Sequence, residues 1–176
     1  MVLHFLIAVL VAIQSPRPVA VVRGGSFEVT VPQGWTASTV TGTLVRLDHS
    51  TGASLLIIRT RSTENLDSFA HRGADRIMAP LGFAKFENPR HFSDSDEELV
   101  QYEIRGNRLS ERRRILYRAL RSKDGLFEVI YENNENRFDI LSTEAQAIAS
   151  SLQSIPQPSP PGRGRRAPGA PVEGRR

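Results

Sequence analysis

The sequence predicts an α+β domain in which an antiparallel β-sheet of about six strands has helices packed on it. Several short runs alternate apolar and polar residues with the period of a half-buried strand. Two longer segments repeat apolar residues at three- and four-residue spacing, as amphipathic helices do. The order is strands, helix, strands, helix, and the short connections between consecutive strands indicate antiparallel pairing.

The first strands are expected within residues 26–60. In residues 26–35 (SFEVTVPQGW), apolar and polar residues alternate until Pro32 and Gly34 end the strand in a turn. Residues 43–48 and Ser54–Thr60 are two further alternating runs, and the polar segment between them predicts a hairpin.

An amphipathic helix is expected between Leu66 and Met78, where the apolar residues repeat at helical spacing. Asn65 is a suitable N-cap, because its side chain can accept hydrogen bonds from the first free backbone N–H groups. Pro80 and Gly82 end the pattern, so we expect about three and a half turns.

The second half of the domain is predicted to contain more strands and a closing helix. We expect a short strand at residues 82–87, a polar loop at 88–96 and an alternating strand at 98–105. Residues 113–122 and 126–132 form a strong hairpin prediction, because an Asp-Gly pair lies between two alternating runs. Apolar residues at helical spacing from Phe138 to Leu152 then predict the last helix.

The N-terminal segment, residues 1–20, has features of a secretory signal peptide. Its uncharged apolar run from Val2 to Ile13 is too short for a bilayer core about 30 Å thick, and prolines follow it. Cleavage is expected after Ser15 or Ala20. These features predict an exported protein, periplasmic or extracellular, either free or peripheral to the membrane.

The composition restricts the chemistry and the partners. The chain has no cysteine, which excludes disulfides, thiol nucleophiles, zinc–thiolate sites and a lipidated N-terminal cysteine. The formal charge of +4 lies mainly in residues 156–176, which hold five arginines against one glutamate, whereas residues 24–155 carry a net charge of −2. A near-neutral domain argues against specific nucleic-acid binding.

Residues 156–176 are predicted to be a disordered tail beyond a single domain at residues 24–155. Proline, glycine and arginine dominate this segment, and it has too few apolar residues to offset the entropy of ordering. Its arginines are candidate contacts to a polyanion such as an anionic membrane surface: Arg163, Arg165, Arg166, Arg175 and Arg176.

The chain resembles the PsbP/Mog-like superfamily, and within it the bacterial DcrB-type exported proteins. The stretches that carry the resemblance are FEVTVPQGW, SLLIIRT with LDSFAHRGADRIM, YRALRSKDGLFEVIYE, and a last helix ending ASSLQSI. The resemblance implies an α-β-α sandwich and a binding or accessory role without catalysis. It supplies no active-site motif, and this chain lacks the lipid-bearing cysteine of many exported relatives.

Neither a catalytic, a cofactor-binding nor a metal-binding residue is predicted. No two of the four histidines have metal-ligand spacing, although His71 and His91 could form a site if they met at Asp75. The acidic segment 94–98 could offer oxygen ligands to calcium, but it lacks the EF-hand pattern, and a solvated loop is the simpler interpretation.

Two further features have a structural and a functional interpretation each. Alternation places Arg112, Arg114 and Arg118 on one face of their strand, either as cross-strand ion pairs or as an anion- or partner-binding site. Trp35 either completes the core or is an exposed anchor, and burial is favoured.

The leading functional hypothesis is an exported, non-enzymatic accessory domain of the cell envelope that binds an envelope protein. The alternative is surface association, in which the basic tail holds the domain near an anionic membrane or another polyanion. A small-molecule pocket between sheet and helices is a third hypothesis, and no residue identifies its ligand.

Overall fold

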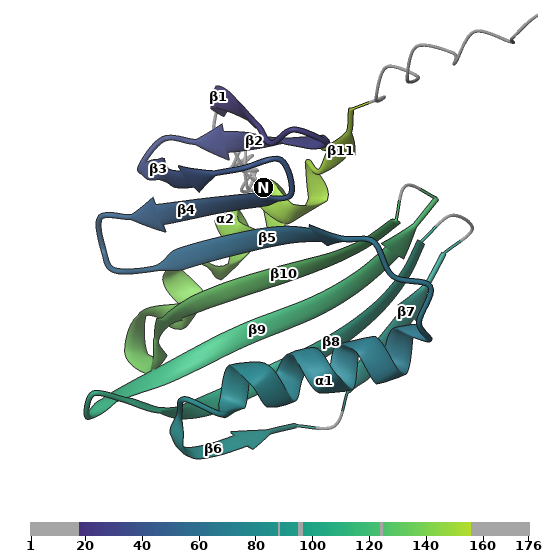
Figure 1. The fold of residues 1–176 in the computed structure, drawn as a ribbon. Coiled ribbons are helices and arrows are strands. Elements are labelled where there is room, and N and C mark those ends of the chain that lie inside the picture. The colour runs from purple at the N-terminus through teal and green to yellow at the C-terminus, as the bar shows by residue number, and fades with distance from the viewer. Residues whose placement is uncertain (1–17, 88, 95–96, 124, 156–176) are drawn as a thin grey trace, which may run out of the picture.

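The computed structural model describes residues 18–155, apart from residues 88, 95–96 and 124. Within these residues the chain forms an eight-stranded and a three-stranded antiparallel sheet with two α-helices (Figure 1). The elements in chain order are β1 (Pro18–Arg23), β2 (Phe27–Pro32), β3 (Trp35–Val40), β4 (Leu44–His49), β5 (Ser54–Thr60), α1 (Leu66–Met78), β6 (Gly82–Phe86), β7 (Arg90–Ser93), β8 (Glu97–Arg108), β9 (Glu111–Ser122), β10 (Gly125–Asn134), the 3-10 helix η1 (Glu135–Arg137), α2 (Phe138–Ser150) and β11 (Gln153–Ser154).

The large sheet has the strand order β3-β4-β5-β10-β9-β8-β6, and β7 pairs with the same edge of β8 farther along that strand. Consecutive strands form the β4–β5, β8–β9 and β9–β10 hairpins. The small sheet has the order β1-β2-β11 and lies beside β3 at one end of the large sheet (Figure 1). Every one of these strand pairs is antiparallel, as the short connections predict.

The two helices lie on opposite faces of the large sheet and over different halves of it (Figure 1). Helix α1 packs on β8 and β9, whereas α2 packs on β10 and on β2 of the small sheet. Each helix closes its own apolar core. The core under α1 contains Phe69, Ile104 and Tyr117, and the core under α2 contains Phe27, Leu55 and Ile148. The α-β-α layering is therefore confirmed.

Most of the predicted elements are present. Strand β5 and helix α1 have the expected bounds, and the Asn65 side chain accepts hydrogen bonds from the backbone N–H groups of Asp67 and Ser68 at 2.9 and 3.3 Å. Glycine 34 lies in the turn after β2 with φ 94°, a conformation that favours glycine. The β9–β10 hairpin and α2 are also where the sequence predicts them.

The prediction of about six strands is too low. Residues 88–96 were expected to be a loop, yet Arg90–Ser93 is β7, whose four side chains are all exposed, so no apolar alternation marks it. Strand β3 is missed for the same reason, because only Trp35 at its start is buried. Strand β11 has two residues, too few for any periodicity.

Strand β1 begins at Pro18, inside the segment expected to be a signal peptide, and pairs with β2. Cleavage after Ser15 leaves this strand whole, whereas cleavage after Ala20 removes half of it. The apolar run at residues 2–13 and the tail at residues 156–176, with its five arginines, lie outside the described residues. Neither described helix has the length and apolar character of a membrane-spanning helix.

Candidate functional site

The candidate site is the face of β8 opposite α1, with the residues of β9 beside it. On this face Leu116 and Leu120 of β9 pack against the core under α2, whereas the β8 residues lie outside that core. Residues directly opposite each other in an antiparallel sheet share a face, so the strand register defines this surface. We call it the arginine face, and it consists of Lys85, Glu87, Arg90, Phe92, Leu99, Gln101, Glu103, Arg105, Asn107, Arg112, Arg114, the buried Leu116, Arg118 and Leu120.

The register arranges these side chains in rows across the strands. Lys85, Arg105 and Arg114 form a cationic row, and the next row contains Glu103 with Glu87 at the edge. The following rows are Arg90–Gln101–Arg118 and Phe92–Leu99–Leu120. Successive rows are about 7 Å apart, because two strand residues span that distance. The face therefore alternates cationic, anionic, cationic and apolar character along β8.

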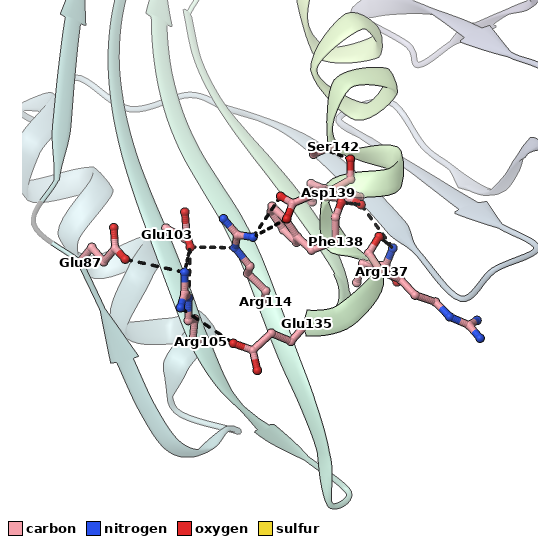
Figure 2. Close-up of polar contacts among 11 residues, drawn as sticks. Glu87, Glu103, Arg105, Arg114, Glu135, Arg137, Phe138, Asp139 and Ser142 are labelled. Carbon is pink, nitrogen blue, oxygen red and sulfur yellow. Dashed lines mark hydrogen bonds and ion pairs between the residues drawn. The ribbon is translucent and has the colours of Figure 1, made fainter.

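The first two rows form an ion-pair network around Glu103 (Figure 2). Its carboxylate accepts hydrogen bonds from Arg114 Nε at 2.7 Å and from Arg105 Nη2 at 2.7 Å. The hydrogen bond from Arg114 lowers the pKa of Glu103, and burial opposes this effect only in part. The same bond raises the pKa of Arg114. Glu103 is consequently an anion that stays ionised to lower pH than a solvated glutamate.

This network also fastens the start of α2 to the sheet. Arg114 Nη1 donates to both carboxylate oxygens of Asp139 at 3.0 and 3.2 Å, and its guanidinium carbon lies 4.3 Å from the centre of the Phe138 ring. Asp139 is in the first helical turn, where the helix dipole favours negative charge. The interpretation of Arg114 as a cross-strand ion pair is therefore confirmed, and its role is structural.

The third row has a different character, because it presents hydrogen-bond donors without a carboxylate. Arg118 Nε donates to Gln101 Oε1 at 2.8 Å, which leaves the amide N–H groups of Gln101 as the outward donors. Within the described residues, neither Arg118 nor Arg90 has an acidic side chain at ion-pair distance. Arg118 is half-buried, and burial lowers the pKa of its guanidinium.

An apolar row lies beside these donors. Phe92 in β7 is 51% exposed although it is a large aromatic residue, and Leu99 and Leu120 next to it are half-buried. Single exposed apolar residues are common, but Phe92 adjoins Leu99 across the β7–β8 pair, and Leu120 at the other end of the row packs against the core under α2. Donors and an apolar strip thus lie side by side on one surface.

The other uncovered half-sheet, beside α1 over β4 and β5, has a pocket of 520 Å³ with Leu56, Ile77 and Ile130 in its lining. Its four arginines all contact carboxylates, in the pairs Arg46–Asp48, Arg76–Glu128, Arg108–Glu132 and Arg113–Glu111. Because these charges are already neutralised, the pocket gives a weaker indication of a charged ligand than the third row of the arginine face.

The other predicted candidates lie apart from this face. His71 Nε2 lies 3.6 Å from Asp75, whereas His91 Nδ1 lies 3.4 Å from Asp67, so the two histidines do not meet at Asp75. Among the residues that can be described, no group of three or more His, Asp or Glu side chains could hold a metal ion. The acidic segment 94–98 is only partly inside the described chain.

Trp35 is buried, as predicted, with 6% of its surface exposed. Its indole N–H donates to Glu144 in α2 at 3.1 Å, which satisfies the only polar group of the ring. Trp35 is therefore part of the core under α2 and not an exposed anchor.

Sequence reasoning found Arg112, Arg114 and Arg118 but missed Arg90 and Gln101. Arg90 lies in the strand that was expected to be a loop, and Gln101 joins the site only through its position opposite both arginines. The alternation predicted for residues 98–105 puts Gln101 on the same face as Glu103 and Arg105, but it does not show which residues lie opposite.

No protein-family model matches the sequence, and no curated protein matches it. Solved structures do share its fold. LpqN of Mycobacterium tuberculosis, which is involved in cell envelope biogenesis, aligns over 74% of this chain and 83% of its own, with 10% identity and a TM-score of 0.55. PA94 of Pseudomonas aeruginosa, a protein of unknown function, aligns over 75% and 92%, with 12% identity and a TM-score of 0.51.

The solution structure of cyanobacterial PsbP (CyanoP) from Synechocystis sp. PCC 6803 also matches. It aligns over 74% of this chain and 88% of its own, with 14% identity and a TM-score of 0.51. The resemblance to the PsbP/Mog-like superfamily is thereby confirmed at the level of the fold. The nearer resemblance to DcrB-type proteins stays a prediction. At these identities the likeness shows a common fold and assigns no activity.

Proposed function

We propose that the chain is an exported, non-catalytic binding domain of the cell envelope, and that it docks a protein partner on the arginine face. The observation that carries this proposal is that Arg118 is half-buried beside the α2 core and has no acidic side chain at ion-pair distance among the described residues. Removing a guanidinium from water without an ionic partner is unfavourable, so a bound anionic group would stabilise this arrangement.

The sign pattern of the face favours a protein over a uniform anionic surface. The row that contains Glu103 lies between two cationic rows, at a backbone spacing of about 7 Å from each, and its carboxylate binds Arg105 and Arg114 of the first at 2.7 Å. A uniform anionic lipid surface would meet arginines that Glu103 already neutralises as well as the donors of the third row, whereas a protein surface can place an acid over the third row alone. An uncovered strip of sheet with an apolar row is also the kind of surface that protein partners cover.

Export to the envelope is supported by two independent features. Residues 1–20 have the composition of a secretory signal peptide, and the fold is shared with LpqN, a protein involved in cell envelope biogenesis. A role without catalysis is supported by the sequence, which has no nucleophile elbow, phosphate loop or metal-ligand motif.

Site-specific photo-crosslinking in intact cells tests the proposal. A benzophenone amino acid in place of Phe92 reports on the arginine face, and the same residue in place of Val21 is the matched control, because both side chains are about half exposed. We expect a discrete protein adduct from position 92 and none of that size from position 21. Adducts of lipid alone, or the same adduct from both positions, would contradict docking on this face.

The tail is tested separately by deleting residues 156–176. Docking on the arginine face requires the adduct from position 92 to persist without the tail. Tethering by the tail arginines instead requires that the deletion release the protein from membranes. It also requires that added salt release the intact chain, because salt shortens the range of charge attraction, which is about 8 Å at physiological ionic strength.

A further inference from the structure

Resting on the proposed function, we infer that Arg90, Gln101 and Arg118 form a carboxylate-binding row. The bound segment of the partner is extended and acidic, with an aspartate or glutamate followed two residues later by an apolar side chain. The acid lies over the row Arg90–Gln101–Arg118, and the apolar side chain lies over Phe92 and Leu99.

The chemistry of the row selects an acceptor. Arg118 uses its Nε–H to hold the Gln101 oxygen, so its terminal N–H groups and the Gln101 amide N–H groups are the donors that face outward. Arg90 adds a second guanidinium from the neighbouring strand. A carboxylate is acceptor-only and charged, which makes it the side-chain group that this combination binds most strongly.

The spacing of the row suits one acidic side chain between two cations. Strands β7, β8 and β9 are neighbours, so Arg90 and Arg118 start about 10 Å apart with Gln101 midway between them. Arginine side chains are long enough to converge on a group placed above Gln101. A carboxylate in that position receives donors from both sides, whereas a neutral amide would leave two charges uncompensated.

The neighbouring row determines the second element of the motif. Phe92 and Leu99 lie two residues along their strands from Arg90 and Gln101, about 7 Å away. In an extended segment, side chains two residues apart point to the same face with the same spacing. An acid and an apolar residue at positions i and i+2 therefore match the donor row and the apolar row together.

Other occupants fit this surface less well. The chain's own residues 156–176 carry five arginines and one glutamate, so their charge is repelled by the donor row. A partner strand with isolated acids avoids that repulsion.

The test titrates the full chain with a synthetic peptide, Ac-Thr-Ser-Glu-Ser-Leu-Ser-Thr-NH2. Binding is monitored by the chemical shifts of the protein in two-dimensional NMR spectra. We expect shifts centred on Arg90, Gln101 and Arg118, with a dissociation constant on the order of 1 mM for so short a ligand. Glutamine in place of the peptide's glutamate, and a peptide in which glutamate and leucine are adjacent, are the ligand controls. Both are expected to bind at least about fivefold more weakly.

Protein variants locate the site. Arg118→Gln and Arg90→Gln are each expected to weaken binding about tenfold, because each removes a charged donor from the row. Arg112→Gln is the matched control, since it removes the same charge from the same strand face at a position 82% exposed. That variant is expected to change the affinity less than about twofold. Arg118→Lys keeps the positive charge at this position. It is the control for a loss of peptide binding that comes only from misfolding.

Several results would overturn the inference. Equal weakening of peptide binding by Arg112→Gln and Arg118→Gln would show unspecific charge attraction. Equal affinities for the glutamine and glutamate peptides would show that the row does not require a carboxylate. Binding to phosphatidylglycerol vesicles that depends on Arg90 and Arg118 would assign the row to lipid. If the peptide does not bind to the chain while the adduct from position 92 forms in cells, this inference is wrong and the proposed function stands. If the peptide binds and that adduct is absent, the proposed function is wrong.

Discussion

Replacing Gly73 by alanine is a severe test of how α1 sits on the sheet. A Cβ atom at this position would lie 1.9 Å from the Tyr117 hydroxyl and 2.8 Å from Glu128 Oε1. Both neighbours are fixed, because Tyr117 is fully buried and donates a hydrogen bond to Glu128 at 2.9 Å. Arg76 donates to the same carboxylate at 2.6 Å. The substitution must therefore displace either the helix or this buried cluster.

The magnitude follows from opposing contributions. Alanine favours the helix by about 1 kcal/mol over glycine. Against this, overpacking a rigid core costs about 1–3 kcal/mol, and losing the bond from Tyr117 to a charged, buried acceptor costs about 1.5–3 kcal/mol. We expect a net loss of about 2–5 kcal/mol in the free energy of unfolding. At about 3 °C per kcal/mol for a domain of this size, the melting temperature falls by about 6–15 °C.

Urea denaturation and calorimetry of Gly73→Ala measure this loss, and Tyr117→Leu supplies the control. In the Tyr117→Leu background the ring is absent, so Gly73→Ala is expected to be neutral or stabilising by up to about 1 kcal/mol. A sign change between the two backgrounds supports the packing described. A neutral or stabilising effect of Gly73→Ala in the unmodified chain would refute it.

Three further predictions concern the network, the core and the N-terminal strand. Because hydrogen bonds lower the pKa of Glu103, its stabilisation is present above its unfolded pKa near 4.5 and is lost as the pH falls through the folded pKa. Glu103→Gln should thus cost about 2 kcal/mol at pH 7 and nothing in strong acid, as measured by urea denaturation. Fluorescence of buried Trp35 should have its maximum well to the blue of free tryptophan in water, and a maximum matching that of the free amino acid would contradict burial. A chain that begins at Pro18 should melt like the full chain, whereas one that begins at Gly24 should lose about 1–2 kcal/mol with the packing of Val22, and equal melting of both would show that β1 contributes nothing.

The parts of the fold that the sequence predicts are those with a local chemical cause. Asn65 caps α1 because its side chain reaches two free backbone N–H groups, and a positive φ at Gly34 ends the first predicted strand. The β8–β9 hairpin lacks such a signal. Its two-residue turn is Leu109–Ser110, both with positive φ, where glycine or asparagine would be expected.

The candidate site was only half predictable, because its rows are a property of pairing. Alternation puts Arg114 and Arg118 on the same face, yet the sequence cannot show that Glu103 neutralises one arginine while Gln101 lies opposite the other. That difference depends on the register between β8 and β9. Arg90 could not be predicted from the sequence, because all four residues of its edge strand β7 are exposed. Such a strand pairs through its backbone and shows no apolar periodicity.

The most direct test of docking on the arginine face combines the crosslinker with charge removal in intact cells. The benzophenone residue is at position 92, and the yield of the protein adduct is compared between an Arg90→Gln/Arg118→Gln chain and an Arg61→Gln/Arg112→Gln chain. The second chain loses the same total charge, from Arg61, exposed just after β5, and from the exposed Arg112. We predict that the adduct disappears from the first chain and persists in the second. Equal yields from the two chains would contradict a partner held by the donor row.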